Sequence, residues 1–352
     1  MSHRCVLVLA GGRGERFWPW STAERPKQFL PLARGGRSLL AATVERALAV
    51  AEPADVLVLT AASLADAVRR EVGPLGVKVA GEPVMRNTAA AIGAAAAWFE
   101  RGGRDPVFAV LPADHAIDDR AAFASDLGRA FELAEKQSVL VTFGVRPASP
   151  DTNFGYVETG ERIAQRLHRV ARFTEKPDRA RAEQWVETGR HLWNTGIFVW
   201  RSSVFLRALE ASRPALAAPL RALPRSGDER ALERSLAEVF PGIESISVDY
   251  AVLEHAPNTV VFEATFDWDD LGSWSAWARR QPQDARGNVT FGDAIAIDCA
   301  RCIVVGEGGL AAALGLTGMV VVHVNGSTLS CRIEDSENVR KVSEAARARG
   351  LS

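Results

Sequence analysis

The sequence predicts an α/β protein with a parallel sheet covered by helices on both faces, followed by a small all-β domain. In the first part of the chain, continuous apolar runs alternate with segments that are apolar at helical spacing. Strands buried on both faces of a parallel sheet have this pattern. After about Gln281, short β-rich stretches with turn residues between them replace it, and little helix is expected before residues 336–349. We therefore expect one domain over residues 1–283 and a second over 284–352.

The elements of the first domain alternate along the chain. The expected strands are 5–10, 55–60, 77–80, 107–111 and 139–144, and the expected helices are 38–50, 63–71, 88–101 and 121–136. In such sheets ligands bind at the carboxyl ends of the strands, on the loops that follow. Short strands are expected in the second domain, at 288–289, 294–297, 302–305, 319–324 and 328–331.

Composition and charge restrict the kind of partner. The 352 residues are 47% hydrophobic, and 42 basic residues balance 43 acidic ones. Without a basic excess, nucleic acid is not an expected partner, and phosphate binding must come from a few placed cations and backbone amides. The apolar run Cys5–Ala10 is too short for a signal-peptide core or a membrane span, so we expect a cytoplasmic protein with no membrane contact. Cys299 and Cys302 form a lone CxxC without a nearby histidine, which we interpret as buried strand residues.

A glycine-rich loop follows the first strand and is the strongest motif. Its glycines allow the backbone to bend and to bring N–H groups close to an anion. Positive side chains surround the same point, and arginine suits phosphate oxygens bidentately. The glycines are Gly11, Gly12 and Gly14, and the cations are Arg13, Arg16 and Lys27.

Two common phosphate-binding motifs do not fit this loop. No Gly-Lys-Ser/Thr closes it, so it is not a P-loop. It also lacks the third glycine of a dinucleotide fingerprint, and Pro19 prevents a helix from starting at the required place. A loop whose glycines only make a turn remains the alternative, although three glycines, three cations and two prolines together favour phosphate binding.

The loop resembles that of sugar-nucleotide pyrophosphorylases, specifically mannose-1-phosphate guanylyltransferases. The family pattern GGxGxRxxPxSxxxPK is present as Gly11-Gly12, Gly14, Arg16, Pro19, Ser21 and Pro26-Lys27. Trp18-Pro19 and Lys27-Gln28-Phe29 are similar to the mannose branch rather than the glucose-thymidylyl branch. The resemblance covers essentially the whole chain. It implies a Rossmann-like, GT-A-like mixed-sheet nucleotidyltransferase domain and a small C-terminal left-handed β-helix-like domain. It also implies nucleotide contacts from Leu9, Gly11, Gly12, Arg13 and Gly14.

A second cluster, Glu82–Ala90, ends a strand and opens a helix. Thr88 or Asn87 could cap that helix, and capping alone would explain them. The resemblance makes Glu82, Arg86, Asn87 and Thr88 candidate contacts to the base and the triphosphate. A carboxylate can accept both N1–H and N2–H of guanine, which adenine does not offer in that arrangement, so GTP is the expected nucleotide.

Two acidic residues are candidate metal ligands. Asp114 lies at the carboxyl end of an apolar strand, where a carboxylate is well placed to hold Mg²⁺ on a triphosphate. The segment Phe266–Trp274 carries three acids flanked by tryptophans and followed by glycine. The resemblance makes Asp114 a Mg²⁺ ligand, and by resemblance to the family pattern Trp-x-Asp-x-Gly-Ser-Trp, Asp270 is the second. We interpret His115 as a structural or polar contact rather than a general base.

Three further segments combine the groups that a sugar phosphate requires. Residues 152–158 look like a hairpin with a glycine that admits a ligand, 172–178 place a carboxylate beside an ammonium, and 192–198 place an amide beside a glycine. An exposed Glu-Lys pair often has no function, and a capped helix start alone would explain Asp249. The resemblance assigns Gly155, Glu175 and Asn194 to the mannosyl group and Lys176 to its phosphate.

The resemblance implies transfer of GMP from GTP to mannose 1-phosphate, which gives GDP-mannose and pyrophosphate. A sugar-phosphate oxygen would attack the α-phosphorus in line, with Arg16, Lys27, Asp114, Asp270 and Mg²⁺ neutralising charge. Two alternatives are a nucleotidyltransferase for another sugar or base, and a non-catalytic regulatory relative that binds sugar nucleotides. Because Lys27, Asp114 and Asp270 are all present, the second is disfavoured. Some longer bacterial relatives in this family carry a metal-dependent sugar-phosphate isomerase domain. The tail of this sequence has no cluster of His and Glu for such a metal, so we expect a single activity. The expected oligomeric state is a homodimer.

Overall fold

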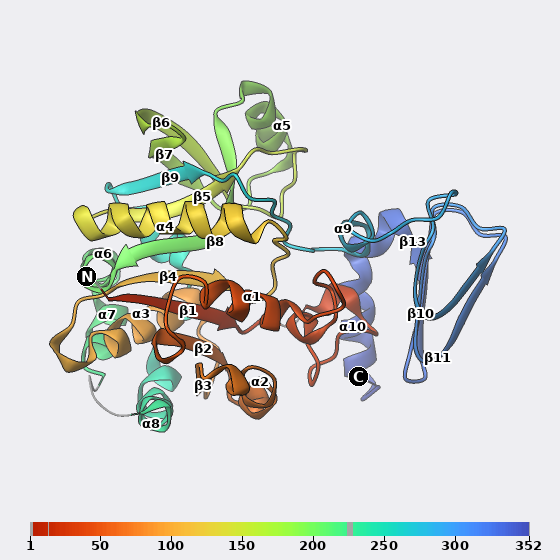
Figure 1. The fold of residues 1–352 in the computed structure, drawn as a ribbon, viewed down its shortest axis with the longest axis horizontal. Coiled ribbons are helices and arrows are strands. Elements are labelled where there is room, and N and C mark those ends of the chain that lie inside the picture. The colour runs from red at the N-terminus through yellow and green to blue at the C-terminus, as the bar shows by residue number, and fades with distance from the viewer. Residues whose placement is uncertain (1–2, 13, 224–227, 352) are drawn as a thin grey trace. The chain divides into compact units, whose positions relative to one another are not determined.

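The computed structural model describes residues 3–12, 14–223 and 228–351 (Figure 1). The chain forms two compact units that are interleaved along the sequence. The first comprises Met1–Gly11, Ala41–Ala113 and Ile117–Trp268, and the second comprises Gly12–Leu40, Asp114–Ala116 and Asp269–Ser352. The boundary expected at 283/284 stays a prediction. Most of the glycine loop nevertheless belongs to the same unit as the C-terminal β-rich segment.

The first unit is built on one nine-stranded sheet, in the order β3-β2-β1-β4-β8-β5-β9-β7-β6. Strands β1 to β4 are parallel, and β5 pairs parallel with β9. The strands are β1 (Arg4–Ala10), β2 (Val56–Ala61), β3 (Lys78–Glu82), β4 (Val107–Pro112), β5 (Leu140–Val145), β6 (Tyr156–Ala164), β7 (Leu167–Thr174), β8 (His191–Arg201) and β9 (Thr259–Glu263).

An antiparallel strand separates the two parallel parts of this sheet. Strand β8 lies between β4 and β5 and is antiparallel to both. The five runs that we expected as strands all form strands, and the sheet is mixed, as the family resemblance implied. An apolar run does not reveal its direction, because a strand covered on both faces looks the same in either orientation.

Alternate residues of the central strands face different helices. Cys5 and Leu7 of β1 share a buried cluster with α3, whereas Arg4 places its guanidinium 5.1 Å from the ring centre of Phe131 on α4. Side chains alternate between the two faces of a strand, so the helices cover both faces of the sheet (Figure 1). The helices within this unit are α2 (Ala65–Val72), α3 (Asn87–Phe99), α4 (Arg120–Lys136), α5 (Arg179–Thr188), α6 (Ser202–Ser212), α7 (Pro214–Arg221) and α8 (Glu229–Val239).

Helix α3 is the central helix of this unit. It packs against α6, α7 and β1, and its residues 89–99 are all buried. A helix that is apolar all round is typical of a protein core. On the other face, Asp119 caps α4 by accepting a hydrogen bond of 2.9 Å from the Ala122 N–H. Helix α1 (Leu39–Ala47) begins in the second unit and ends in the first.

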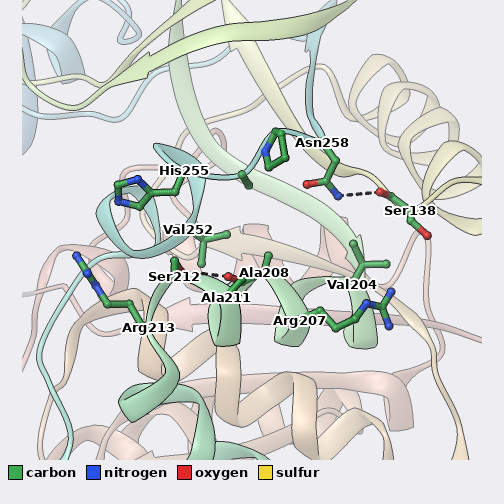
Figure 2. A pocket seen from close by; sticks show the side chains of 12 residues that line it. Ser138, Val204, Arg207, Ala208, Ala211, Ser212, Arg213, Val252, His255 and Asn258 are labelled. Atoms are coloured by element: carbon green, nitrogen blue, oxygen red, sulfur yellow. Dashed lines mark hydrogen bonds between the residues drawn. The ribbon is translucent and has the colours of Figure 1, made fainter.

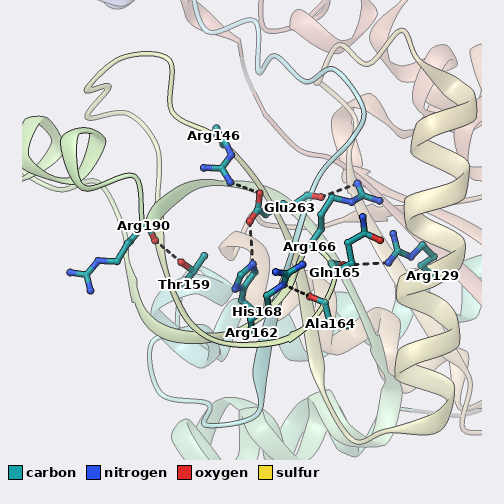
Figure 3. Close-up of polar contacts among 10 residues, drawn as sticks. All are labelled: Arg129, Arg146, Thr159, Arg162, Ala164, Gln165, Arg166, His168, Arg190 and Glu263. Carbon is teal, nitrogen blue, oxygen red and sulfur yellow. Dashed lines mark hydrogen bonds and ion pairs between the residues drawn. The ribbon is translucent and has the colours of Figure 1, made fainter.

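The hairpin of the first unit lies later in the chain than expected. Residues 152–155 form a loop that leads into β6, and the turn itself is at 165–166, between β6 and β7. Figure 3 shows polar contacts between this hairpin and β9: Glu263 Oε1 lies 3.1 Å from His168 Nε2, and the Glu263 carbonyl accepts a 3.4 Å hydrogen bond from Arg166. Arg166, at the turn, has a positive φ of 59°.

The second unit contains a four-stranded sheet and a C-terminal helix. Strand β10 (Val289–Ile297) is parallel to β11 (Ile303–Leu314), which is parallel to β12 (Met319–Val324), and β13 (Ser327–Arg332) is antiparallel. Parallel neighbours normally need a crossover of a dozen or more residues. Here only residues 298–302 join β10 to β11, so the strands follow each other as in the coil of a β-helix. Helix α10 (Val339–Ala348) follows the short 3₁₀ helix Ile333–Asn338.

Aromatic side chains from distant segments form the core of the second unit. Trp20 of the glycine loop stacks on Trp274 with ring centres 5.8 Å apart and meets Trp277 edge-on at 5.5 Å. Its indole N–H donates a 2.7 Å hydrogen bond to Glu307 of β11. Helix α9 (Trp274–Ala278) carries both partner tryptophans. The glycine loop and the C-terminal strands therefore share one core.

In the part of the chain that the structure describes, no helix is long and apolar enough to cross a membrane. Cys299 and Cys302 are both buried, in a small apolar cluster with Val304, Ala311 and Ala313.

Candidate active site

The glycine loop packs closely on Lys27 within the second unit. Gly14 has a φ of +62°, and a Cβ there would lie 2.2 Å from Lys27 Cβ, closer than atoms can approach. The Gly14 carbonyl accepts a 2.6 Å hydrogen bond from the Ser21 hydroxyl. Only glycine fits this conformation and this contact. Arg13, which the sequence also placed in the loop, lies outside the described residues.

Lys27 connects the two acidic segments. Its Nζ lies 2.8 Å from Asp114 Oδ2 and donates a 2.6 Å hydrogen bond to the Asp270 backbone carbonyl. The side chain is 7% exposed, and it belongs to the short 3₁₀ helix Lys27–Phe29. The segments also pair directly, because Ala116 and Asp269 exchange backbone hydrogen bonds of 2.9 and 3.1 Å. The structure thus brings together residues that are about 150 positions apart.

The two carboxylates have different environments. Burial raises the pKa of Asp114, but the adjacent Lys27 and His115 charges and the Lys27 hydrogen bond lower it more, to below its ordinary value. Burial raises the pKa of Asp270 to about 6, with Asp269 and Asp114 adding to the effect and Lys27 opposing it. The Asp114 charge thus acts on Asp270, as expected for carboxylates that share one site. His115 lies 3.8 Å from Asp114 Oδ1.

Arg16 lies beside Asp270, in the same pocket as Lys27 and Asp114. Its Nη1 donates a 3.1 Å hydrogen bond to the Gly272 carbonyl, and the Gly272 N–H donates a 3.0 Å bond to Asp270 Oδ1. A Cβ on Gly272 would lie 2.9 Å from both Arg16 Nη1 and Asp270 Oδ2, so the glycine leaves room for these groups. These side chains line a pocket of about 290 Å³, bounded by Gly14, Glu15, Arg16, Phe17, Lys27, Asp114, Asp270, Leu271, Gly272 and Arg340. No motif singled out Glu15 or Arg340.

The predicted nucleotide residues of the first unit lie at the ends of β1 and β3. Leu9 is in β1, and a Cβ on Gly11 would lie 2.3 Å from Met85 Cε. Glu82, the last residue of β3, is 3% exposed, and its Oε2 has no hydrogen-bond partner among the described residues. Burial raises the pKa of Glu82 to about 8.

The neighbouring polar residues contact the protein itself. Arg86 donates a 2.7 Å hydrogen bond from Nε to the Phe240 carbonyl and another from Nη2 to the Pro241 carbonyl. Asn87, with a positive φ of 64°, accepts a 2.8 Å bond from the Thr88 N–H, and the Thr88 hydroxyl accepts one of 2.8 Å from the Val248 N–H. These contacts fix the first turn of α3.

The four predicted sugar-phosphate residues form one cluster within the first unit. Lys176 Nζ lies 2.7 Å from Glu175 Oε1, and a Cβ on Gly155 would lie 2.5 Å from Glu175 Oε2. The Gly155 carbonyl accepts a 2.8 Å bond from the Asn194 N–H. Burial lowers the pKa of Lys176, but the Glu175 carboxylate raises it above its ordinary value.

Asn194 is oriented by two side chains that motif reasoning did not assign to a site. Its Oδ1 accepts a 2.8 Å hydrogen bond from the Thr142 hydroxyl, and its Nδ2 donates one of 3.3 Å to Asp249 Oδ1. Burial, with the nearby Glu175 charge, raises the pKa of Asp249 to about 7. Asp249 begins a π-helical turn, Asp249–Leu253, whereas the sequence suggested an ordinary capped helix. No motif marked Asp249 as a site residue, because its contact with Asn194 joins segments 55 positions apart in the sequence.

A second pocket, of about 560 Å³, lies between α6 and the segment 252–258 (Figure 2). No residue that the sequence predicted for the site lines it. Ser212 joins its two walls by donating a hydrogen bond to the Ala251 carbonyl.

Family models and individual relatives match nearly all of the chain. A model described as nucleotidyl transferase matches residues 5–287, and one described as a mannose-phosphate isomerase/GMP-like β-helix domain matches 292–345. Mannose-1-phosphate guanylyltransferase of Klebsiella pneumoniae is 37% identical over an alignment of 344 positions that covers 96% of this chain and 73% of the relative. Xanthan biosynthesis protein XanB of Xanthomonas campestris pv. campestris is 37% identical over an alignment of 356 positions that covers 100% of this chain and 75% of the relative.

One solved structure matches almost the full length. It is described as mannose-1-phosphate geranyltransferase from Thermus thermophilus, is 34% identical, and superposes with a TM-score of 0.87 over 98% of this chain and 99% of its own. The predicted fold class, a mixed α/β domain followed by a β-helix-like domain, is confirmed by this similarity and by both family models.

Proposed function

The chain belongs to the nucleotidyl transferase family, within the mannose-1-phosphate guanylyltransferases, and from this we propose that it transfers GMP from GTP to α-D-mannose 1-phosphate. The products are GDP-mannose and pyrophosphate. The observation that carries the proposal is the position of Lys27, which lies between the Asp114 carboxylate and the Asp270 segment in a pocket with Arg16. Cations and acids combined in this way suit a metal-bound phosphate chain.

The reaction needs no protein nucleophile. A phosphate oxygen of mannose 1-phosphate forms a bond to the α-phosphorus of GTP, while the bond from that phosphorus to the bridging oxygen of pyrophosphate breaks. Charge moves onto the leaving pyrophosphate, so positioning and neutralisation are the catalytic contributions. Lys27 and Arg16 neutralise the negative charge that develops on the pyrophosphate. Because Lys27 is nearly buried, its ammonium interacts with phosphate more strongly than an exposed lysine would.

Nucleotidyl transferases generally use a divalent metal ion. We propose Mg²⁺, held by Asp114 and Asp270, because hard carboxylate oxygens are its preferred ligands and the two acids act on each other electrostatically. When bound, Mg²⁺ neutralises phosphate charge and orients the triphosphate. The raised pKa of Asp270 describes the protein without the cation, and a bound cation favours its ionised form.

Base and sugar selection come from the first unit. We assign Glu82 to the guanine edge, since its buried Oε2 has no hydrogen-bond partner among the described residues and its two carboxylate oxygens can accept from N1–H and N2–H. Glu175 and Asn194 bind the mannosyl hydroxyls, Lys176 binds the sugar phosphate, and Gly155 leaves space for the ring. Leu9 and Gly11, Gly12 and Gly14 supply backbone contacts to the nucleotide. Arg86, Asn87 and Thr88 shape the start of α3, whose N–H groups face the nucleotide.

The test is pyrophosphate release by the purified protein with Mg²⁺, using each of four nucleoside triphosphates against mannose 1-phosphate and glucose 1-phosphate. We expect release with GTP and mannose 1-phosphate alone. Release with another pair would move the specificity roles of Glu82 and Glu175 while keeping the mechanism. Nucleotide binding without release for any pair would instead support a regulatory relative. A cytoplasmic location and a homodimer remain predictions, which fractionation and light scattering would check.

A further inference from the structure

The C-terminal helix α10 contributes to the phosphate pocket. Arg340, in its first turn, lines the same pocket as Arg16 and Lys27, although the β10–β13 sheet separates it in sequence from every other lining residue. Helix α10 also packs against the 3₁₀ helix Glu15–Phe17, which directly follows Gly14 of the glycine loop. The helix that ends the chain therefore belongs to the pocket wall.

Glu15 is the link between helix and loop. Its Oε2 lies 3.4 Å from Arg340 Nε, and its Oε1 pairs with Arg347 Nη2, one α-helical repeat of seven residues further along. Both carboxylate oxygens are thus occupied by α10. The Glu15 side chain is only 15% exposed, whereas the Arg340 side chain is 66% exposed, so Arg340 is held at one end and remains accessible to a ligand.

The charge of the pocket indicates what Arg340 does there. Among the described residues, the lining contains three carboxylates, Glu15, Asp114 and Asp270, and three cations, Arg16, Lys27 and Arg340. Arg340 therefore adds positive charge beside Arg16 and Lys27, where a phosphate chain would otherwise lie against the three acids.

Among the described residues, the contacts of Arg340 leave the terminal nitrogens of its guanidinium available. The contacts of Arg340 with Glu15 and with Glu344, at 3.4 and 2.8 Å, both use Nε. A guanidinium has five N–H donors in a fixed fork, and its terminal Nη groups are the ones that bind phosphate bidentately. Glu15 and Glu344 thus hold the side chain by its inner nitrogen.

We propose that Arg340 binds the pyrophosphate portion of the nucleotide, with Glu15 and Arg347 as positioning residues that hold Arg340 and the glycine loop together. The inference rests on the proposed function and extends it, because it assigns part of the phosphate site to the C-terminal domain. Arg340 neutralises charge on the leaving group, and it plays no part in recognising the sugar.

The test compares kinetics in both directions for Arg340→Ala and Arg340→Lys. We expect Arg340→Ala to raise KM for pyrophosphate, in the reverse reaction with GDP-mannose, by roughly 10- to 100-fold, the usual worth of a charged hydrogen bond. KM for mannose 1-phosphate should change less than about twofold, and Arg340→Lys should recover part of the loss. A control is Lys341→Ala, the next residue on α10, which is not part of the pocket lining and should behave as wild type.

A double variant separates binding from positioning. If Arg340 touches phosphate, Arg340→Ala will raise KM for pyrophosphate further in a Glu15→Gln background. If Arg340 acts only through Glu15, the second substitution will add nothing, and the proposed phosphate contact is wrong. Equal increases in KM for pyrophosphate and mannose 1-phosphate would also overturn it. An inactive wild-type protein would instead contradict the proposed function, so the two failures are distinguishable.

Discussion

Replacing Glu82 by glutamine is expected to stabilise the fold, and to do so increasingly as the pH rises from 5 to 7. The carboxyl group is 3% exposed, and its Oε2 has no hydrogen-bond partner among the described residues. Burial raises its pKa from an ordinary value of 4.5 to about 8. The folded protein therefore keeps the proton over a pH range in which the unfolded chain has already lost it.

The sign and the size of the pH effect on stability follow from the difference between the folded and unfolded pKa of Glu82. Because the folded pKa is the higher one and the group is an acid, ionisation favours the unfolded chain, and stability falls as the pH rises from about 4.5 to about 8. One pKa unit corresponds to about 1.4 kcal/mol, so the loss is about 1 kcal/mol at pH 5 and about 3 kcal/mol at pH 7. Glutamine has a similar shape and does not ionise, so the variant escapes this loss.

The assay is urea denaturation of both proteins at pH 5, 6 and 7, followed by circular dichroism at 222 nm. The advantage of Glu82→Gln should grow by about 2 kcal/mol between pH 5 and pH 7. Glu187→Gln, an exposed position on α5, is the matched control and should differ from wild type by less than about 0.5 kcal/mol at each pH. An advantage of Glu82→Gln that is the same at pH 5 and pH 7 would refute the reasoning.

Three further outcomes are expected. GTP should bind more tightly as the pH rises from 6.5 to 8.5, because the proposed contact with guanine requires ionised Glu82. Calorimetry of GTP binding in buffers of different ionisation enthalpy should detect one released proton in the wild-type protein and none in the Glu82→Gln variant. Lys27→Ala and Asp270→Ala should each lose roughly 10²–10³ in turnover with an unchanged circular dichroism spectrum, and near-normal rates would remove that residue from the mechanism. Gly155→Ala should raise KM for mannose 1-phosphate about tenfold or more, since its Cβ would lie 2.5 Å from Glu175 Oε2, while KM for GTP stays within about twofold.

Local structure was predictable because it depends on neighbouring residues. The helix expected over 121–136 is α4, Arg120–Lys136, and the one expected over 88–101 is α3, Asn87–Phe99. Their apolar spacing and first-turn polar residues are properties of the segment itself. The segment 192–198 lies in β8, whose place between β4 and β5 depends on contacts that no local pattern encodes.

The arrangement of the site depended on long-range pairing. Asp114 and Asp270 lie in one pocket because the Ala116 and Asp269 backbones pair, and neither segment carries a signal for the other. The resemblance to family motifs identified the candidate site residues, but it did not predict which of them contact each other. Arg340 had no motif at all, since one arginine in an amphipathic, charge-rich helix resembles any solvated residue. Asp249 was hidden in the same way, because a capping role explained it.

Trp274, beside the acidic segment that contains Asp270, belongs to a buried core that supports the pocket. Trp274, two residues after Gly272, packs in one buried cluster with Phe17, Trp20 and the strands of the C-terminal sheet. Trp20 and Arg25 both bind Glu307 of β11, so the segment between Gly14 and Lys27 is fastened to that sheet. The distance from Lys27 to Asp114 and Asp270 thus depends on packing that the C-terminal strands complete. A substitution that loosens this core, such as Trp20→Ala, should therefore lower turnover along with stability, because Arg16 and Lys27, the proposed phosphate-binding cations, and their supporting core are a single packed unit.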